Sequence, residues 1–261
     1  ITAGANNTMT MTASDYVNSG TSNDDYAKAD SFSITDRITH KIYDGALYTT
    51  LGLRHEDVEY HEYTGGVHGA TRHENSQTMF AISSVLDMEN GSSAFVSYSQ
   101  GYQPTGVSSQ EPEESDNYEI GYRSNSMNSS MEIIGFHVDY ERLYETCNIA
   151  AACANSSNIA KNAGEAHVTG LEFLYRVNNL LSAPQMKGTD NTSSGIRYPM
   201  VVSVTLQEAE HDFTSGTSFA DGARIAYTPE EIYYISIGAE TNNWDMQLSL
   251  KYNDDVYNKG V

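Results

Sequence analysis

The sequence predicts an all-β fold, an antiparallel up-and-down meander of about eleven strands. The first observation behind this prediction is a two-residue alternation, in which Trp244, Met246, Leu248, Leu250 and Tyr252 are separated by polar residues. Since successive side chains of a strand point to opposite faces, this segment has one apolar and one polar face. The second observation is that no stretch approaches the roughly 18–20 consecutive apolar residues of a membrane-spanning helix. The stripe fits either a sandwich core or the lipid-facing wall of a barrel.

The alternation recurs in three other segments, each of which predicts an apolar stripe on one face. They are Leu47/Thr49/Leu51/Leu53, Ile134/Phe136/Val138/Tyr140 and Leu171/Phe173/Tyr175/Val177. In chain order, the expected strands are residues 2–14, 28–41, 45–62, 76–88, 92–102, 115–124, 130–144, 165–178, 196–210, 229–240 and 244–253. The Tyr, Thr and Val of these segments favour strands, and the Gly and Asn between them favour turns.

The connections between the expected strands alternate in length. Short turns are expected at residues 43–45, 89–91, 124–128 and 241–243, and long polar loops at residues 15–27, 63–75, 103–114, 145–164 and 211–228. Residues 179–195 are longer than the alternation requires and are interpreted as an inserted turn. Such alternation gathers the long loops at one end, as in outer-membrane barrels, whereas a sandwich mixes connection lengths through Greek-key crossings. The apolar stripes are therefore expected to face lipid.

Composition narrows the classes of partner. The chain has 14 Lys and Arg against 35 Asp and Glu, a net charge of −21, which argues against nucleic acid and against attraction to anionic lipid. A mean hydropathy of −0.49 is compatible with a membrane barrel, because a barrel strand gives only half of its positions to lipid.

The two cysteines, Cys147 and Cys153, lie six residues apart in a polar loop. We expect them to form a small disulfide made in an oxidising compartment; two unrelated thiols are the alternative. The chain opens on ITAGANNTMT, so any export signal is expected to have been removed or to lie outside these residues.

A metal site or a catalytic centre is not expected. Four histidines (His55, His61, His68 and His73) are interleaved with carboxylates, but their spacing fits no structural zinc pattern. The acidic run at residues 253–255 lacks the ligand rhythm of a calcium loop. The sequence has no nucleophile-elbow motif and no phosphate-binding Gly-rich loop, so we expect no enzyme activity, no catalytic residue and no cofactor.

Four stretches carry a resemblance to a known family. They are residues 52–60 (GLRHEDVEY), 95–104 with 113–123 (FVSYSQGYQP and EESDNYEIGYR), 168–173 (VTGLEF) and 227–230 (YTPE). In their order along the chain they resemble the barrel signatures of TonB-dependent outer-membrane receptors. The resemblance covers nearly the whole chain from about residue 30.

The resemblance implies a 22-stranded transmembrane barrel, of which residues 1–261 are expected to supply one part, without the plug domain and without the final strands. It also implies uptake of a ferric siderophore or similar chelate across the bacterial outer membrane, lipid around the wall, and energy from TonB through the missing plug. At the bases of the long loops, Tyr102, Gln103 and Tyr227 are the expected ligand contacts. An aromatic girdle at the membrane interface is the alternative role for each Tyr.

The barrel interpretation assigns the side chains of residues 118–123 alternately to two faces of the wall. Tyr118, Ile120 and Tyr122 alternate with Glu119, Gly121 and Arg123. Glu119 and Arg123 are then expected in the lumen, either in ion pairs between strands or in contact with ligand.

Two other functions stay open at this point. A barrel-derived fragment could assemble through its sheet edges into a multimer or filament, and a secreted sandwich enzyme or lectin would bury the same stripes in a core. In a receptor, Leu171, Phe173, Trp244 and Leu248 face lipid instead.

Overall fold

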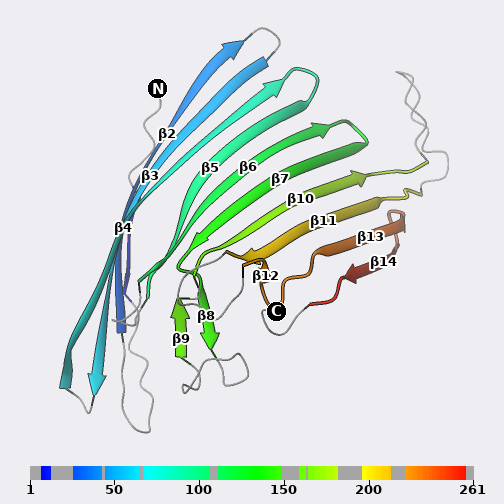
Figure 1. Cartoon of the computed structure of the whole chain (residues 1–261). Coiled ribbons are helices and arrows are strands. Elements are labelled where there is room, and N and C mark those ends of the chain that lie inside the picture. Colours follow the sequence, from blue (N-terminus) through cyan, green and yellow to red (C-terminus); the bar gives the residue numbers. More distant parts are fainter. Residues whose placement is uncertain are drawn as a thin grey trace.

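In the computed structural model of the chain (Figure 1), a large antiparallel sheet accounts for most of the ordered residues. The structure describes residues 7–12, 26–42, 45–64, 67–105, 111–147, 159–162, 164–181, 196–212 and 221–256. Within these ranges no helix is long and apolar enough to cross a membrane.

Eleven strands follow one another across the sheet in chain order, each antiparallel to the next. They are β1 (Asn7–Thr12), β2 (Tyr26–Ile42), β3 (Gly45–Thr64), β4 (Val67–Met88), β5 (Ser92–Gln103), β6 (Glu113–Asn125), β7 (Ser129–Glu141), β10 (Ala166–Val177), β11 (Met200–His211), β13 (Glu231–Glu240) and β14 (Asp245–Asn253). A short β12 (Ala223–Arg224) pairs with the end of β11, and β8 (Tyr144–Cys147) pairs with β9 (Ile159–Asn162) in a separate hairpin. The predicted meander of about eleven strands is confirmed.

The predicted loop at residues 63–75 is wrong. Strand β3 continues to Thr64 and β4 begins at Val67, so this connection is the tip of a long hairpin (Figure 1). The hairpin extends beyond the apolar part of the sheet. Polar residues then occupy both faces, and the alternation that marks the other strands disappears.

The two faces of the sheet differ sharply in polarity. Among the described strand residues, every exposed large hydrophobic side chain lies on one face, which we call the apolar face. On this face Ile120 is 66% exposed and Leu248 73% exposed. The stripes predicted on β3, β10 and β14 all belong to it. The opposite face carries polar and charged residues together with some apolar ones, and we call it the mixed face.

The stripe predicted on β7 lies on the other side of the sheet. Gly135 pairs with Ile120 and Leu171 and therefore shares the apolar face with them. Ile134, Phe136, Val138 and Tyr140 consequently lie on the mixed face, so the expectation that they face lipid is wrong. The residues of β7 do alternate, but the pairing with the neighbouring strands determines which of the two alternating sets lies on the apolar face.

Phe136 has a definite place on the mixed face. It pairs with Gly170 of β10, where an added Cβ would collide with the Phe136 ring. Phe95 of β5 covers Gly121 of β6 in the same way. Gly121 and Gly170 are thus each covered by a ring from the neighbouring strand.

The sheet has little core of its own. Only five described hydrophobic residues are buried: Val58, Ala166, Val177, Ala209 and Ala223. A layer this thin cannot bury its apolar face against itself. The apolar face therefore needs an apolar surrounding.

Candidate functional site at the loop-side end of the sheet

The ends of the strands that lie away from the short turns carry most of the charged clusters. At the opposite end, Gly91 (φ 83°) forms a tight turn, with its amide donating to the Met88 carbonyl over 3.1 Å. At the loop-side end, Pro104 and Pro112 flank the connection from β5 to β6 and cannot donate to a ladder. Strand β5 ends at Gln103 and β6 begins at Glu113.

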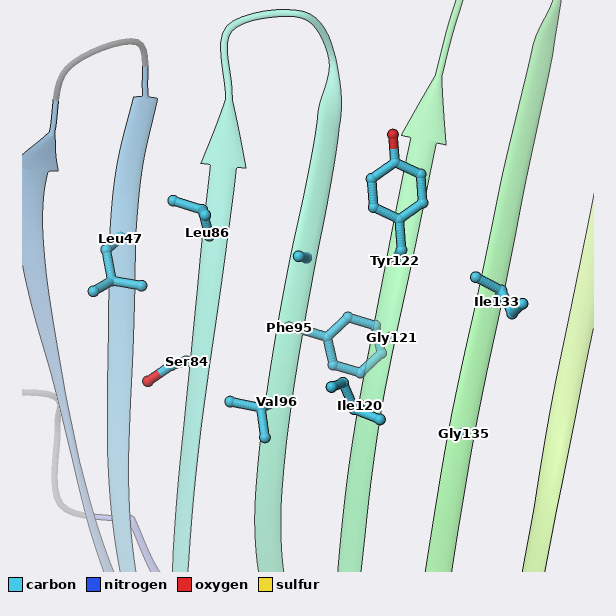
Figure 2. A pocket seen from close by; sticks show the side chains of 11 residues that line it. Leu47, Ser84, Leu86, Phe95, Val96, Ile120, Gly121, Tyr122, Ile133 and Gly135 are labelled. Carbon is cyan, nitrogen blue, oxygen red and sulfur yellow. The ribbon is translucent and has the colours of Figure 1, made fainter.

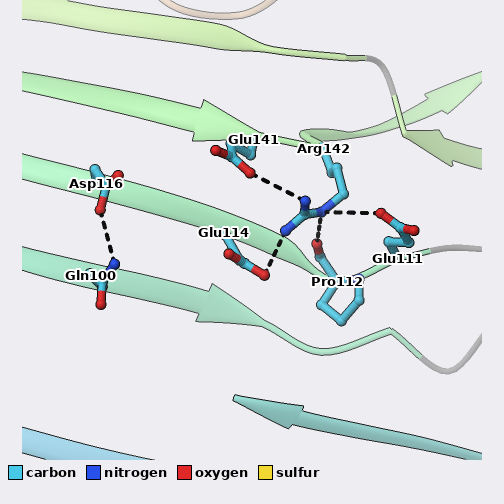
Figure 3. A network of polar contacts seen from close by, with 7 residues as sticks. All are labelled: Gln100, Glu111, Pro112, Glu114, Asp116, Glu141 and Arg142. Atoms are coloured by element: carbon cyan, nitrogen blue, oxygen red, sulfur yellow. Dashed lines mark hydrogen bonds and ion pairs between the residues drawn. The ribbon is translucent and has the colours of Figure 1, made fainter. Parts of the chain in front are cut away.

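Arg142 binds the β5–β6 connection to the end of β7 (Figure 3). It follows β7 with a φ of 57°, a left-handed conformation that redirects the chain. Its guanidinium reaches Glu114 at 2.5 Å and Glu141 at 3.2 Å, and its Nε donates to the Pro112 carbonyl over 2.8 Å. Glu111 lies 3.8 Å from the same Nε. One guanidinium thus lies near three carboxylates, so the cluster keeps a net negative charge.

A second acidic group lies on the apolar-face side of the same strands. Asp116 accepts hydrogen bonds from the Tyr98 hydroxyl over 2.7 Å and from the Gln100 amide over 3.3 Å. His137 lies 2.9 Å from Asp139, and His167 lies 3.0 Å from Asp212. Asp116, Asp139 and Asp212 border a hollow of about 270 Å³, which we call the acidic hollow. Its carboxylates are Glu114, Asp116, Asp139, Glu141, Glu165 and Asp212.

The sheet opens between β4 and β5 at this end. Their ladder stops at the Ala81–Ser99 pair. Beyond it, side-chain amides bridge the strands: the Phe80 backbone N–H donates to Gln100 over 3.1 Å, and Asn75 donates to the Thr105 carbonyl over 2.8 Å. The amide bridges hold β4 beside β5 where the backbone ladder no longer does.

The three predicted ligand contacts do not lie together. Tyr102 pairs with Glu114 on the apolar-face side, whereas its neighbour Gln103 pairs with Glu113 on the mixed face. Tyr227 is 71% exposed with a φ of 60°, in the connection between β12 and β13. Four strands separate it from β5 in the sheet order. Alternation alone puts adjacent residues 102 and 103 on opposite faces, so this part of the placement was readable from the sequence.

The predicted lumen charges have specific partners. Arg123 pairs with Glu132 of β7 and stacks over the Phe95 ring at 4.4 Å. The Ser97 hydroxyl donates to Glu119 over 3.1 Å. Both charges lie on the mixed face, and for Arg123 the inter-strand ion pair is confirmed.

The four histidines singled out in the sequence all belong to the β3–β4 hairpin, His55 and His61 on β3 and His68 and His73 on β4. His55 lies 3.2 Å from Asp57 and 2.8 Å from the Thr78 hydroxyl. The side chains of His61 and His68 lie outside the described residues. In the part of the chain that the structure describes, no group of three His, Cys, Asp or Glu residues is placed to hold a metal ion.

The predicted disulfide falls on a part of the chain whose side chains the structure does not describe. Cys147 ends β8, and Cys153 lies outside the described residues. The Cys147–Cys153 pairing stays a prediction.

Sequence reasoning missed Arg142. Arg142 stands in no motif; the available signal was a lone Arg between Glu141 and Leu143, opposite the acidic run at residues 113–116. Its role depends on which strand ends meet.

The model of the family described as "TonB dependent receptor-like, beta-barrel" matches residues 2–260 of the chain. A search of curated proteins finds no match.

Solved structures with a similar fold include three transport proteins. The ferric citrate transporter FecA in unliganded form has a TM-score of 0.65 at 16% identity, over 89% of this chain and 33% of that chain. The ferric yersiniabactin uptake receptor FyuA from Yersinia pestis has 0.59 at 16% identity, over 88% and 35%. The copper transporter OprC has 0.60 at 11% identity, over 87% and 34%. At these identities the likeness concerns the fold, and the chain spans about a third of each neighbour's length.

Proposed function

Because this chain belongs to the TonB-dependent receptor-like β-barrel family and forms part of a bacterial outer-membrane barrel, we propose that the complete protein imports a scarce metal chelate. A ferric siderophore or a similar iron complex is the cargo we favour, with energy delivered through TonB. The proposal covers the whole protein, of which residues 1–261 supply a section of wall.

The observation that carries the proposal is the family match over residues 2–260 on a sheet with one continuous apolar face. In a barrel, an apolar face meets lipid and the other face lines the lumen. Two of the three neighbours are named for ferric complexes and one for copper. These names support a small metal complex as cargo, and they favour iron.

Within this wall we propose that Gln103 and Tyr227 contact the cargo. Gln103 lies on the mixed face at the loop-side end, where a polar amide would line the entrance to the lumen. Tyr227 is exposed beside β13. For Tyr102, whose position falls on the apolar-face side, we propose the interfacial girdle.

Further partners are part of the same proposal. We place the TonB contact in a plug domain outside these residues. The Cys147–Cys153 disulfide would close a small loop in the outer connection between β7 and β10.

The test is uptake of radiolabelled iron by cells that express the complete protein. We expect iron from at least one ferric chelate to accumulate only when TonB is present. The matched control is the same strain with TonB deleted and equal receptor in the outer membrane. Uptake that is equal with and without TonB would contradict the proposal, and so would no uptake from any chelate class at normal receptor levels.

We keep an assembly through sheet edges as the alternative proposal, because the edge of a sheet can recruit another chain. The intact mass of the native protein separates the two functions: a mass near 28.7 kDa, that of residues 1–261 alone, favours assembly, and a severalfold larger mass favours the receptor.

A further inference from the structure

Strand β4 extends well beyond its neighbour β5 at the loop-side end of the sheet (Figure 1). Within the apolar part of the sheet the two strands lie side by side, with Ser84 of β4 directly opposite Val96 of β5 (Figure 2). Their ladder covers only residues 81–87 of β4. In the described part of the sheet, residues 72–80 of β4 therefore have a backbone ladder with β3 alone.

The backbone groups that face the side of β5 belong to alternate residues of β4. The Phe80 N–H points to that side, because it donates to the Gln100 side chain over 3.1 Å. In an antiparallel sheet the N–H and C=O of one residue point to the same neighbour, and the direction alternates along the strand. Those of Ser76 and Thr78 therefore also face β5, and no ladder within the described residues receives them. We call residues 72–78 the open edge.

The open edge has the regular geometry that an added strand needs. The register between β3 and β4 runs without a shift from the Gly45–Met88 pair to the His61–Arg72 pair. Residues 72–78 contain no Pro and no bulge, two features by which proteins commonly block an edge. The side chain of Asn75, which donates to Thr105, points to the mixed face and so lies out of the plane of this edge.

Carboxylates lie on both sides of the open edge. Asp57 of β3 pairs directly with Ser76, and Asp116 of β6 pairs with Gln100, to which it is hydrogen-bonded in Figure 3. The acidic hollow begins beside the edge, because Gln77 of β4 and Gln100 of β5 line it. A positively charged segment is attracted to this position, whereas a second copy of the chain, with a net charge of −21, is repelled.

We propose that the open edge binds an extended, positively charged segment of a partner protein, which adds to β4 as an extra strand. Backbone hydrogen bonds to Ser76 and Thr78 supply the pairing, as in other cases of strand addition. Basic side chains of the segment meet Asp57 on one side of the edge and the acidic hollow on the other. Strand pairing gives the segment its register, and charge selects its composition.

The binding test uses the complete protein, purified in detergent, and a fluorescent peptide of alternating Lys and Thr. The peptide has about eight residues, enough to span the open edge at ~3.3 Å per residue. We expect saturable binding by fluorescence anisotropy, and roughly tenfold weaker binding of a peptide of alternating Glu and Thr. Equal binding of the two peptides would overturn the charge assignment. No saturation by the Lys peptide up to about 1 mM would overturn the site itself.

Hydrogen exchange at single residues tests the strand pairing without any variant. In the free protein, we expect the amides of Ser76 and Thr78 to exchange roughly tenfold faster than those of Gln77 and Met79, which point to β3. The Lys peptide should slow the first pair and leave the second unchanged. Equal exchange of both pairs in the free protein would show that the edge is closed. Peptide binding without protection of Ser76 and Thr78 would rule out strand addition.

A proline at the edge removes one donor from the open side. Proline is accepted at an edge position whose N–H faces away from the neighbouring strand. Ser76→Pro should weaken binding of the Lys peptide roughly three- to tenfold, whereas Ser76→Ala, which keeps the N–H, is the matched control. Equal affinities of the two variants would place the peptide elsewhere. The exchange experiment decides the question if Ser76→Pro does not fold.

The flanking charges are tested separately. Asp57→Asn with Asp116→Asn keeps the shape and removes two charges, and should weaken binding of the Lys peptide roughly three- to tenfold. Glu208→Gln with Asp245→Asn removes the same charge from exposed positions outside the hollow and is the control. An equal loss in both double variants would show that only the overall charge matters. None of these readouts involves a metal chelate, so a failure here leaves the proposed uptake function standing.

Discussion

The ring of Phe136 on β7 covers Gly170 on β10, its direct partner in the ladder. Phe95 covers Gly121 two strands earlier, and both pairs lie on the mixed face. An aromatic ring over a strand glycine shields a backbone that has no side chain of its own and fixes the register of the two strands. At Gly170 and Gly121 no side chain projects from the strand on the mixed face, and the neighbouring ring occupies that space.

Gly170→Ala should destabilise the barrel more than an ordinary glycine substitution in a strand. The added methyl would meet the Phe136 ring and lie 2.8 Å from the Leu206 carbonyl oxygen. Overpacking of this kind costs about 1–3 kcal/mol. Urea unfolding of the complete protein in lipid vesicles measures the loss. Gly52→Ala is the matched control, because its new Cβ would lie 3.6 Å from Ala81 Cβ. Equal stability of the two variants would contradict the packing that we describe.

The sequence predicts correctly which face each residue occupies where one face of a strand meets water and the other meets lipid. On β14 every second residue from Met246 to Tyr252 is apolar, and the assignment of faces is correct. On β7 the sequence reads Ile133-Ile134-Gly135-Phe136, with apolar residues on both faces. There the choice of face depends on the register with β6 and β10, which a single strand does not contain.

The loop-side end is harder to predict for a related reason. Beyond the apolar band polar residues lie on both faces, so β4 could begin at Val67, nine residues before the predicted strand, without an alternation in the sequence to indicate it. Arg142 acts through Glu114 and Pro112, which belong to a different part of the chain. Such a cluster forms only when strand ends that are distant in the sequence come together in the folded sheet.

Arg142→Gln should loosen the β5–β6 connection without unfolding the wall. The variant removes the cation that Glu114 and Glu141 share, so these carboxylates repel one another. Because Arg142 is partly exposed, we expect roughly a three- to tenfold faster proteolytic cleavage in this connection. Limited proteolysis with mass spectrometry measures the rate on intact cells. Arg197→Gln, which removes an ion pair with Glu240 at 3.2 Å, is the control and should leave that rate unchanged. Cleavage at the wild-type rate in Arg142→Gln would show that the clamp does not hold the connection.

Gln103→Ala should weaken cargo binding, whereas Tyr102→Phe should not. The two residues are adjacent but lie on opposite faces, and only Gln103 lies on the face that lines the lumen. Loss of one hydrogen bond to cargo should raise the Kd roughly threefold to tenfold. Titration of the purified complete receptor with the cargo found in the uptake experiment gives both values. If Tyr102→Phe weakens binding and Gln103→Ala does not, the assignment of faces at the entrance is reversed.

Cysteine substitutions at two adjacent positions of β7 test which face of the sheet each side chain occupies. Spin labels at Ile133→Cys and Ile134→Cys should report opposite surroundings, because Ile133 shares the apolar face with Tyr122 and Phe173 while Ile134 pairs with Gly121 on the mixed face. In vesicles, the label at residue 133 should be relaxed more strongly by oxygen, which concentrates in acyl chains, and the label at residue 134 more strongly by a water-soluble nickel chelate. Leu248→Cys and Ser249→Cys on β14 calibrate the two limits, since there sequence and structure agree on the faces. If residue 134 behaves like residue 248, the alternation read directly from β7 is right, and the register placing Phe136 over Gly170 is wrong.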